Sequence, residues 1–406
     1  MREFWQGRRI LVGVCGGIAA YKTCQLVSAL AQEEAQLRVI LTGSGESFVS
    51  PLTFAALSRH SAYTDRDFWH YQSGRPLHIE LAEWAEVILL TPLTANTLAK
   101  IALGLADNLL TNVLLASTSP VLLAPAMNTE MWKAPPVQRH WQDLLNNPRF
   151  WGLSPTRGRL ACDSVGEGRM AEPAFLQAAL FALLWTNGQK DWQGRCLLIS
   201  GGGTRESIDR VRFIGNPASG KMGFALAEAA MLRGATVIWI HAGDPLPDIP
   251  GVMGHVVTTA SEMHQALAEY FPQVDLLIMA AAVGDVRPRY PASGKLPKAD
   301  LPLSLDLELI PDILQDLVSR KRPQQKVIGF AAQTGDPLPA ALEKLTRKGL
   351  DAIVANPIDQ PDAGFASSFN QGVWLTASGE SQGIPYTSKQ AMAHRILDLA
   401  GQLEKP

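Results

Sequence analysis

The sequence has little cysteine, no long apolar run and no block of charge of one sign. Its 406 residues include four cysteines, Cys15, Cys24, Cys162 and Cys196. These are too few and too scattered for a disulfide framework or a zinc site, and a reducing, cytoplasmic location fits them best. No apolar run is long enough to span a membrane, and the basic start of the chain leads into a strand-like run and a glycine turn rather than a signal peptide.

The charge of the chain is nearly balanced. Lysine and arginine total 36 and aspartate and glutamate 38, so the formal net charge is -2. Neither nucleic acid nor an anionic membrane is therefore expected as a main partner. With 47% hydrophobic and 18% charged residues, the composition is that of a globular protein. The length is sufficient for two domains that each bury a core.

Short apolar runs alternate with helix-like segments along the whole chain, and a polar joint at residues 186–194 divides them into two sets. Strands that alternate with helices form parallel sheets covered on both faces. We therefore expect an α/β protein with two doubly wound, mostly parallel-sheet domains, flavodoxin-like over residues 1–189 and Rossmann-like over residues 190–406. One expected helical stretch covers residues 94–117. The expected strands are residues 9–14, 37–42, 87–92, 120–127, 196–203, 235–243, 275–283, 326–333 and 351–357.

Ligands bind beyond the carboxyl ends of the strands in such sheets, so the residues there are candidates for a binding site. A glycine turn after the first strand can present backbone amides to an anion, although it lacks the G-x-G-x-x-G spacing of a dinucleotide site and is also typical of an ordinary tight turn. The polar residues after the second and third strands are also typical helix caps. Gathered at one sheet edge, they would suit a mononucleotide cofactor. The candidates are Gly16, Gly17, Ile18, Thr42, Ser44, Thr94 and Asn96.

Three further segments of the first half carry candidate residues. Residues 125–132 end the fourth strand with Asn128 and Met131, although packing at a strand end explains the methionine equally well. His78 precedes a short helical run, where a lone histidine is more often structural than catalytic. Cys162 lies in the stretch GRLACDSVGEGRM, whose three glycines predict a flexible loop.

Six motifs follow one another between residues 8 and 185: GGIAAYK, SFVSPLTFAAL, HIEL, TANTLAKIALGLADNLL, PAMNTEMW and LACDSVGEGRM. Together they resemble the flavin-containing cysteine decarboxylases, in particular phosphopantothenoylcysteine decarboxylase. The resemblance implies that this half binds FMN and removes the cysteine carboxylate of phosphopantothenoylcysteine. It also implies that His78 is catalytic, that Asn128 holds the substrate carboxylate, and that Cys162, on a flexible flap, donates the final proton.

One residue departs from the pattern of this family. Asp163 follows the cysteine where the family commonly has glycine. A carboxylate beside a thiol disfavours the thiolate, so we expect Asp163 to keep Cys162 protonated.

The second half opens with another strand, glycine turn and helix over residues 196–232, which is typical of many nucleotide-binding folds. Asp285 ends a buried strand, and the Pro/Gly-rich loop after it carries Lys295, although such loops are usually only solvated. Lys344 and Lys348 lie four residues apart on one helix face. Like charges at this spacing repel unless they are exposed or share an anion.

These features resemble phosphopantothenate–cysteine ligase, the usual fusion partner of the decarboxylase, over about residues 195–400. The resemblance implies that CTP activates the carboxylate of 4'-phosphopantothenate as an acyl-cytidylate, from which cysteine displaces CMP, with Mg²⁺ held mainly by the CTP phosphates. It also implies that Asn216 and Arg212 act in the formation or turnover of the acyl-cytidylate, and that Lys295 supports the transferring phosphate. The CTP pocket that it implies contains Ala281, Asp285, Pro311, Asp312, Ile313, Leu314, Phe330, Lys344 and Lys348.

Both resemblances together imply a bifunctional carboxy-lyase and acid–amino-acid ligase of coenzyme A biosynthesis, with trimeric decarboxylase domains and dimeric ligase domains. Its small-molecule substrates would be 4'-phosphopantothenate, cysteine and CTP. Pro297 stands where the ligases commonly have lysine, which could raise the requirement for CTP. Two alternatives remain open: another flavin-binding decarboxylase or prenyltransferase-like protein fused to a nucleotide-binding domain, and a regulatory subunit that only binds. A regulatory subunit would be expected to lack an intact set of His78, Asn128 and Cys162.

Overall fold

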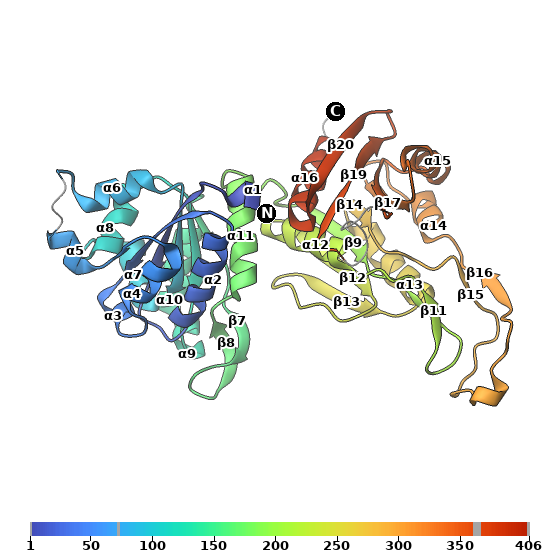
Figure 1. Ribbon diagram of the computed structural model, residues 1–406, viewed down its shortest axis with the longest axis horizontal. Helices are drawn as coiled ribbons and strands as arrows, with labels where there is room; N and C mark the ends of the chain where they lie inside the picture. Colours follow the sequence, from blue (N-terminus) through green and yellow to red (C-terminus); the bar gives the residue numbers. More distant parts are fainter. Residues whose placement is uncertain (1, 71–73, 360–366, 404–406) are drawn as a thin grey trace. The chain divides into compact units, whose positions relative to one another are not determined.

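The computed structural model describes residues 2–70, 74–359 and 367–403 (Figure 1). The chain forms two compact units, Met1–Gln189 and Lys190–Pro406. Each unit is built around one large, mostly parallel sheet with helices on both faces. The α/β fold class predicted from the sequence is confirmed.

The first unit contains a six-stranded sheet in the order β3-β2-β1-β4-β5-β6, and every pairing in it is parallel. The strand order reverses between β1 and β4, which makes that point of the carboxyl edge the natural ligand crevice. The central strand β4 is buried along its whole length, as expected for a doubly covered sheet. The strands are β1 (Arg9–Val14), β2 (Gln36–Leu41), β3 (Ala62–Tyr63), β4 (Val87–Leu93), β5 (Val121–Pro125) and β6 (Phe150–Gly152).

The predicted helical stretch 94–117 is two helices rather than one. Gly104 ends α7 in the left-handed conformation with φ +71, and Asn108 begins α8 with a capping box. The helices are α1 (Arg2–Trp5), α2 (Ala20–Gln32), α3 (Gly43–Glu46), α4 (Pro51–Ser58), α5 (Asp65–His70), α6 (Leu77–Trp84), α7 (Ala95–Leu103), α8 (Leu109–Ala116), α9 (Thr129–Lys133), α10 (Pro135–Leu145) and α11 (Pro173–Trp185).

A separate hairpin in the first unit carries the cysteine that the sequence singles out. Strands β7 (Thr156–Arg159) and β8 (Val165–Arg169) pair antiparallel, and Cys162 lies in the turn between them. The stretch predicted as a flexible loop is therefore a β-hairpin.

The second unit contains an eight-stranded sheet in the order β13-β12-β9-β14-β17-β18-β19-β20. The pairings from β13 to β18 are parallel, and the last two strands pair antiparallel at one edge. The strand order reverses between β9 and β14. The strands are β9 (Cys196–Gly201), β12 (Thr236–Ala242), β13 (Met253–Val257), β14 (Leu276–Met279), β17 (Lys326–Gln333), β18 (Ala352–Pro357), β19 (Phe369–Thr376) and β20 (Ser381–Ser388).

Helices cover both faces of this second sheet (Figure 1). On one face α12 packs against α16. On the other face, helices α13, α14 and α15 share one core with the sheet through Leu267, Leu314 and Leu345. The helices are α12 (Lys221–Leu232), α13 (Ala260–Tyr270), α14 (Ile313–Ser319), α15 (Leu338–Lys348) and α16 (Lys389–Gln402), with short 3₁₀ helices at Phe271–Gln273 and Lys298–Asp300.

Two small hairpins leave the carboxyl edge of the second sheet and form what we call the arm, residues 205–215 and 286–309 (Figure 1). One hairpin pairs β10 (Arg205–Ser207) with β11 (Phe213–Gly215), and the other pairs β15 (Val286–Pro288) with β16 (Leu307–Leu309). The backbone amide of Ala292 donates to the Ile208 carbonyl at 2.9 Å, which ties the two segments together.

Candidate functional site

The glycine turn after β1 forms a cradle at the carboxyl edge of the first sheet. A Cβ on Gly16 would lie 2.3 Å from Cβ of Ser44, so only glycine permits the close approach of these two loops. Within the described residues, no acceptor meets the backbone amides of Gly16, Gly17 or Ile18. The side chain of Ile18 is 62% exposed. The turn therefore offers donors and an apolar surface to a ligand.

The polar residues at the same edge divide into two kinds. Thr42 and Thr94 are helix caps, since their Oγ1 atoms accept from Gly45 N at 3.2 Å and from Thr97 N at 3.3 Å. Ser44 and Asn96 are exposed, and their side chains have no hydrogen bond within the described ranges. The caps shape the edge, and the other two side chains are available to a ligand.

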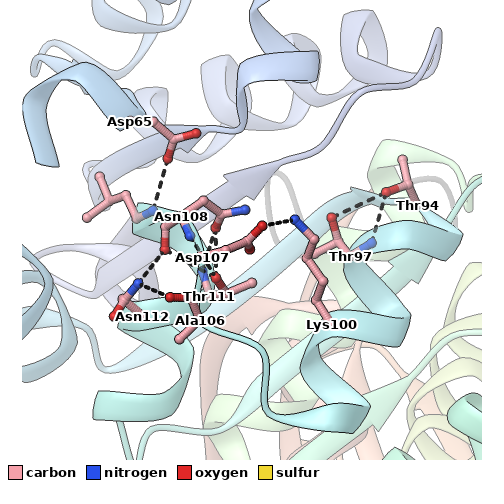
Figure 2. Close-up of polar contacts among 10 residues, drawn as sticks. Asp65, Thr94, Thr97, Lys100, Ala106, Asp107, Asn108, Thr111 and Asn112 are labelled. Atoms are coloured by element: carbon pink, nitrogen blue, oxygen red, sulfur yellow. Dashed lines mark hydrogen bonds and ion pairs between the residues drawn. The ribbon is translucent and has the colours of Figure 1, made fainter.

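A polar network fixes the segment that joins α7 and α8 beside this edge (Figure 2). Lys100 Nζ donates to Asp107 Oδ2 at 2.6 Å, and the Leu109 amide donates to Asp65 Oδ1 at 2.9 Å. Asn108 Oδ1 accepts from Thr111 N at 2.9 Å. The motif TANTLAKIALGLADNLL thus holds the two helices and their connection in place next to Thr94.

Asn128 and Cys162 come together although two helices and two strands separate them in the sequence. Asn128 Nδ2 donates to Cys162 Sγ at 3.4 Å, and Ser164 Oγ lies 3.1 Å from the same sulfur. Asn128 Oδ1 accepts from the Glu130 amide at 2.8 Å, which caps α9 and orients the side-chain amide. Both residues line a cavity of about 560 Å³ with Lys133 and Arg157.

The expectation for Asp163 is wrong. Asp163 adopts φ +65 and turns its carboxylate to Arg159, whose Nη2 lies 2.7 Å from Oδ1. The pKa of the Cys162 thiol is lowered rather than raised, first by the Ser164 hydroxyl and backbone and then by Asn128. A left-handed residue points its carboxylate away from the thiol before it, and the sequence does not reveal that conformation.

Two glycines of the hairpin have packing roles. A Cβ on Gly166 would lie 2.3 Å from Thr129 Oγ1, and one on Gly168 would lie 2.2 Å from the Met127 carbonyl oxygen. Because glycine has no side chain, these two positions allow the hairpin to pack against the segment that follows β5. This docking places Cys162 beside Asn128.

His78 and Met131 do not line the cavity at Cys162. His78 lies in the first turn of α6, where its ring meets the edge of Phe68 at 5.5 Å, and its buried Nδ1 has no partner in the part of the chain that the structure describes. Met131 is 49% exposed on α9, while Trp132 packs into the core.

The second unit has a cavity of about 510 Å³ at the carboxyl edge of its sheet. Ten residues singled out in the sequence line it, from β17 itself and from the segments that follow β11, β14, β16 and β17. They are Asn216, Ala281, Asp285, Pro311, Asp312, Ile313, Leu314, Phe330, Lys344 and Lys348.

Lys344 and Lys348 point from α15 to groups beside this cavity. Lys344 Nζ donates to the Phe330 carbonyl at 2.7 Å, and Lys348 Nζ lies 2.9 Å from Asp312 Oδ2. Burial, together with the Lys348 charge, lowers the pKa of Lys344 to about 8. The pair is therefore a partly desolvated cationic site that an anion would stabilise.

Arg212 and Lys295 lie on the arm and do not line the cavity. Arg212 Nη1 pairs with Asp209 Oδ2 at 2.5 Å and donates to the Leu296 carbonyl at 3.3 Å, while Lys295 is exposed. Burial would raise the pKa of Asp209, but hydrogen bonds from the Val211, Arg212 and Leu296 amides and the Arg212 charge lower it to about 2. Asp209 thus organises the base of the arm.

The sequence interpretation gave no role to several polar residues that line the same cavity, among them Lys221, Asn370 and Lys389. Lys221 follows a glycine turn, which is a usable signal. Asn370 lies in β19 and Lys389 directly follows β20, and at this antiparallel edge the rule about carboxyl ends of parallel strands gives no guidance. Lys389 is only 6% exposed, and burial together with the Lys221 charge lowers its pKa to about 8.

The described residues contain neither a cluster of metal ligands nor a membrane-spanning helix. No group of three or more His, Cys, Asp or Glu residues there could hold a metal ion. No helix there is both long enough and apolar enough to cross a membrane.

Two family models match the chain, one for each unit. Residues 3–184 match the family described as Flavoprotein. Residues 192–403 match the family described as DFP, the DNA/pantothenate metabolism flavoprotein C-terminal domain.

Known proteins are similar to the chain as a whole and to each half. The coenzyme A biosynthesis bifunctional protein CoaBC of Bacillus subtilis (strain 168) is 40% identical over 399 residues, covering 98% of both chains. The solved C-terminal domain of a CoaBC protein is 33% identical and covers 53% of this chain and 98% of its own, with a TM-score of 0.46. A solved PPC decarboxylase mutant complexed with pantothenoylaminoethenethiol is 37% identical and covers 45% of this chain and 100% of its own, with a TM-score of 0.41.

Proposed function

The chain belongs to the family of coenzyme A biosynthesis bifunctional proteins CoaBC, and from this premise we propose how its two units divide the two activities. The enzyme has a flavoprotein decarboxylase domain and a DFP ligase domain. The first unit would hold the phosphopantothenoylcysteine decarboxylase site and the second the phosphopantothenate–cysteine ligase site. The family resemblance seen in the sequence is confirmed. Bifunctional relatives that match over both halves disfavour another flavin-binding decarboxylase or prenyltransferase-like protein fused to a nucleotide-binding domain, and they disfavour a regulatory subunit that only binds.

In the first unit, the carboxyl edge fits a mononucleotide such as FMN. Support comes from the glycine cradle, where a Cβ on Gly16 would meet Ser44, and from three backbone amides without acceptors in the described structure. Gly17, Ile18 and Asn96 would complete the contacts to the cofactor. When bound, FMN supplies the two-electron chemistry that makes loss of the carboxylate possible.

The pair of Asn128 and Cys162 would act on the substrate. The Asn128 amide is positioned to donate to the substrate carboxylate, and the Cys162 thiol to donate the last proton. The 3.4 Å contact between them is the single observation that carries this assignment. A lowered pKa makes this thiol a better proton donor at neutral pH than an ordinary cysteine.

In the second unit, we assign CTP to the side of the cavity formed by α14 and α15. Lys344 and Lys348 would neutralise the phosphates, and Phe330 and Ala281 would contact the nucleoside. Asn216 Nδ2, which donates to the Ala282 and Val283 carbonyls at 3.3 Å, would hold the acyl-cytidylate at the end of β14. Mg²⁺ would be bound mainly by the triphosphate itself.

We also propose that neighbouring subunits complete both sites. In the first unit, His78 does not line the cavity at Cys162, which is what a trimer with shared sites predicts. In the second, Arg212 and Lys295 lie on the arm, whose exposed apolar side chains would be covered in a dimer. These side chains are Val211, Phe213, Tyr290, Leu303, Leu307 and Leu309.

Two single variants test the assignments separately. Cys162→Ser should slow the last protonation, so that decarboxylation stops before 4'-phosphopantetheine is released. Asn216→Asp should allow the acyl-cytidylate to form but slow its turnover, which quenched reactions with labelled CTP would detect. Unchanged product release in the first variant or unchanged turnover in the second would overturn the corresponding assignment.

A further inference from the structure

A shared carboxylate joins the base of the β7–β8 hairpin to the first turn of α2. Glu172, just before α11, accepts with Oε1 from Lys22 Nζ at 2.7 Å and from Arg169 Nη2 at 3.0 Å. Lys22 lies in the first turn of α2, and Arg169 is the last residue of β8. The carboxylate therefore bridges two elements whose residues Lys22 and Glu172 lie 150 positions apart in the sequence.

A buried chain of hydrogen bonds makes a second link between the same two elements. Thr23 Oγ1 donates to the Thr91 carbonyl at 2.9 Å, and Thr91 Oγ1 donates to Met170 Sδ at 3.0 Å. Thr23 and Thr91 are fully buried, and Met170 is 2% exposed. Both links connect the same turn of α2 to the same end of the hairpin, so this junction is more than one surface contact.

The ionic link is only partly open to solvent. The Lys22 side chain is 13% exposed, whereas the Glu172 side chain is 54% exposed. Among the described residues, no other carboxylate pairs with Lys22. Removal of the Glu172 charge would therefore leave a mostly buried ammonium unpaired, which costs more than the loss of a fully exposed ion pair.

The junction connects the two parts of the proposed decarboxylase site. Helix α2 follows the glycine turn at residues 16–18, and the hairpin carries Cys162 in its turn. The Arg169 side chain also lies across β7, because a Cβ on Gly158 would be 2.6 Å from its Nη1 atom. A contact that holds Arg169 therefore holds both strands of the hairpin. Glu172 does not line the cavity at Cys162, so its effect on the thiol would pass through the hairpin.

We propose that Glu172 is a positioning residue of the decarboxylase, which fixes the base of the hairpin on α2 and so holds Cys162 beside Asn128. This inference rests on the proposed decarboxylase function and on the assignment of the last proton to Cys162. A loosened base lets the turn of the hairpin move away from Asn128, whose contact helps to lower the pKa of the thiol. Glu172 thus acts on the proton transfer without touching the substrate.

The test variant is Glu172→Gln, which removes the charge and keeps the size of the side chain. We expect kcat for decarboxylation per bound flavin to fall about fivefold, the size of one ion pair, with KM for phosphopantothenoylcysteine within about twofold of the wild type. The midpoint of Cys162 alkylation against pH should move upward. It should move less than in Ser164→Ala, because Ser164 lies in the turn itself and stays beside the thiol. A loss of global stability alone would not shift this midpoint.

A matched control is Glu86→Gln. Glu86 also pairs with an arginine, Arg8, but this pair lies at the amino edge of the sheet, before β4 and β1. This variant should keep kcat within about twofold of the wild type and leave the alkylation profile unchanged. Lys22→Met tests the proposed contact from its other end. Because both residues act through one contact, the double variant of Lys22 and Glu172 should lose no more activity than the weaker single variant.

Alkylation of the full chain needs no turnover, so it separates this inference from the proposed function. If the wild type releases no carbon dioxide from phosphopantothenoylcysteine, the decarboxylase assignment fails. A profile that moves in Glu172→Gln and not in Glu86→Gln would still support the positioning role. The inference is overturned if the Glu172→Gln profile overlays the wild type, or if the losses of Glu172→Gln and Lys22→Met multiply in the double variant.

Discussion

The side-chain amide of Asn128 donates to the Cys162 sulfur at 3.4 Å, and the same side chain caps α9 through its oxygen. The cap fixes which end of the amide faces the thiol. Docking of the β7–β8 hairpin through Gly166 and Gly168 brings the sulfur to it. The helix cap at Asn128 and the close packing of the two glycines therefore position Asn128 beside Cys162.

Replacing Asn128 with aspartate separates the cap from the thiol contact. Aspartate also caps helices well, so α9 should persist, but a carboxylate beside the sulfur should raise the pKa of Cys162. Decarboxylation should fall by about tenfold or more. The rate of Cys162 alkylation against pH, followed by mass spectrometry, measures the shift. Ser164→Ala should shift the same profile upward while it keeps Asn128, and a profile for Asn128→Asp that overlays the wild type would contradict the contact.

We expect the substitution Asp163→Gly to have little effect on decarboxylation. The ion pair of Asp163 with Arg159 is exposed and worth about 0–1 kcal/mol. Glycine also relieves the left-handed φ of +65, which offsets the lost pair. We expect decarboxylation within about twofold of the wild type and almost no change in the alkylation profile of Cys162. A large drop in either measurement would restore a direct role for the carboxylate.

The cofactor cradle can be tested with two adjacent glycines. Gly16→Ala places a Cβ 2.3 Å from Ser44, whereas the nearest atom to a Cβ on Gly17 is 3.8 Å away. Gly16→Ala should therefore purify with much less bound flavin and a lower Tm, and Gly17→Ala should unfold like the wild type. Flavin absorbance per chain and a melting curve give both values. Equal flavin content in the Gly16 variant and the wild type would rule out the cradle.

Binding of CTP should be coupled to protonation of Lys344. In the protein without CTP, the pKa of Lys344 is about 8, and a bound triphosphate should raise this pKa. Proton uptake is therefore expected when CTP binds near or above pH 8, but not near pH 6.5, where the lysine is already charged. Calorimetry in buffers of different ionisation enthalpy counts the protons. Lys344→Met should lower the count at the higher pH, and a count in the wild type that does not change with pH would refute the coupling.

We expect the structural stability of the arm to depend on the carboxylate of Asp209. Its pKa of about 2 lies below the ordinary 3.8. The carboxylate therefore stabilises the fold above about pH 4 and loses this effect as the pH falls toward 2. Asp209→Asn should speed hydrogen exchange at the amides of Val211, Arg212 and Leu296, with buried amides of β9 as the internal control. Equal protection of these amides in the variant would show that Asp209 does not hold the arm.

Much of the fold and of both candidate sites follows from sequence patterns. Apolar runs identify the central strands, and the glycine turns and polar residues after them identify the ligand edges. Ten of the predicted ligase residues line one cavity because carboxyl ends of parallel strands share one edge.

The remaining features depend on conformations that the sequence does not encode locally. The left-handed φ of Asp163 reverses the expected effect on Cys162. Asp209 accepts from the amide of Leu296, 87 residues away in the sequence, and so joins the two segments of the arm, which holds Arg212 and Lys295 outside the cavity. Lys389 enters the cavity from the antiparallel edge of the sheet, where no strand-end pattern marks it.

The most direct measurement is a mass spectrum of the products that the purified protein forms from 4'-phosphopantothenate, cysteine, CTP and magnesium. We predict 4'-phosphopantetheine, with CMP and carbon dioxide released. Accumulation of phosphopantothenoylcysteine would contradict the decarboxylase assignment, and the absence of any CTP-dependent product would contradict the ligase assignment.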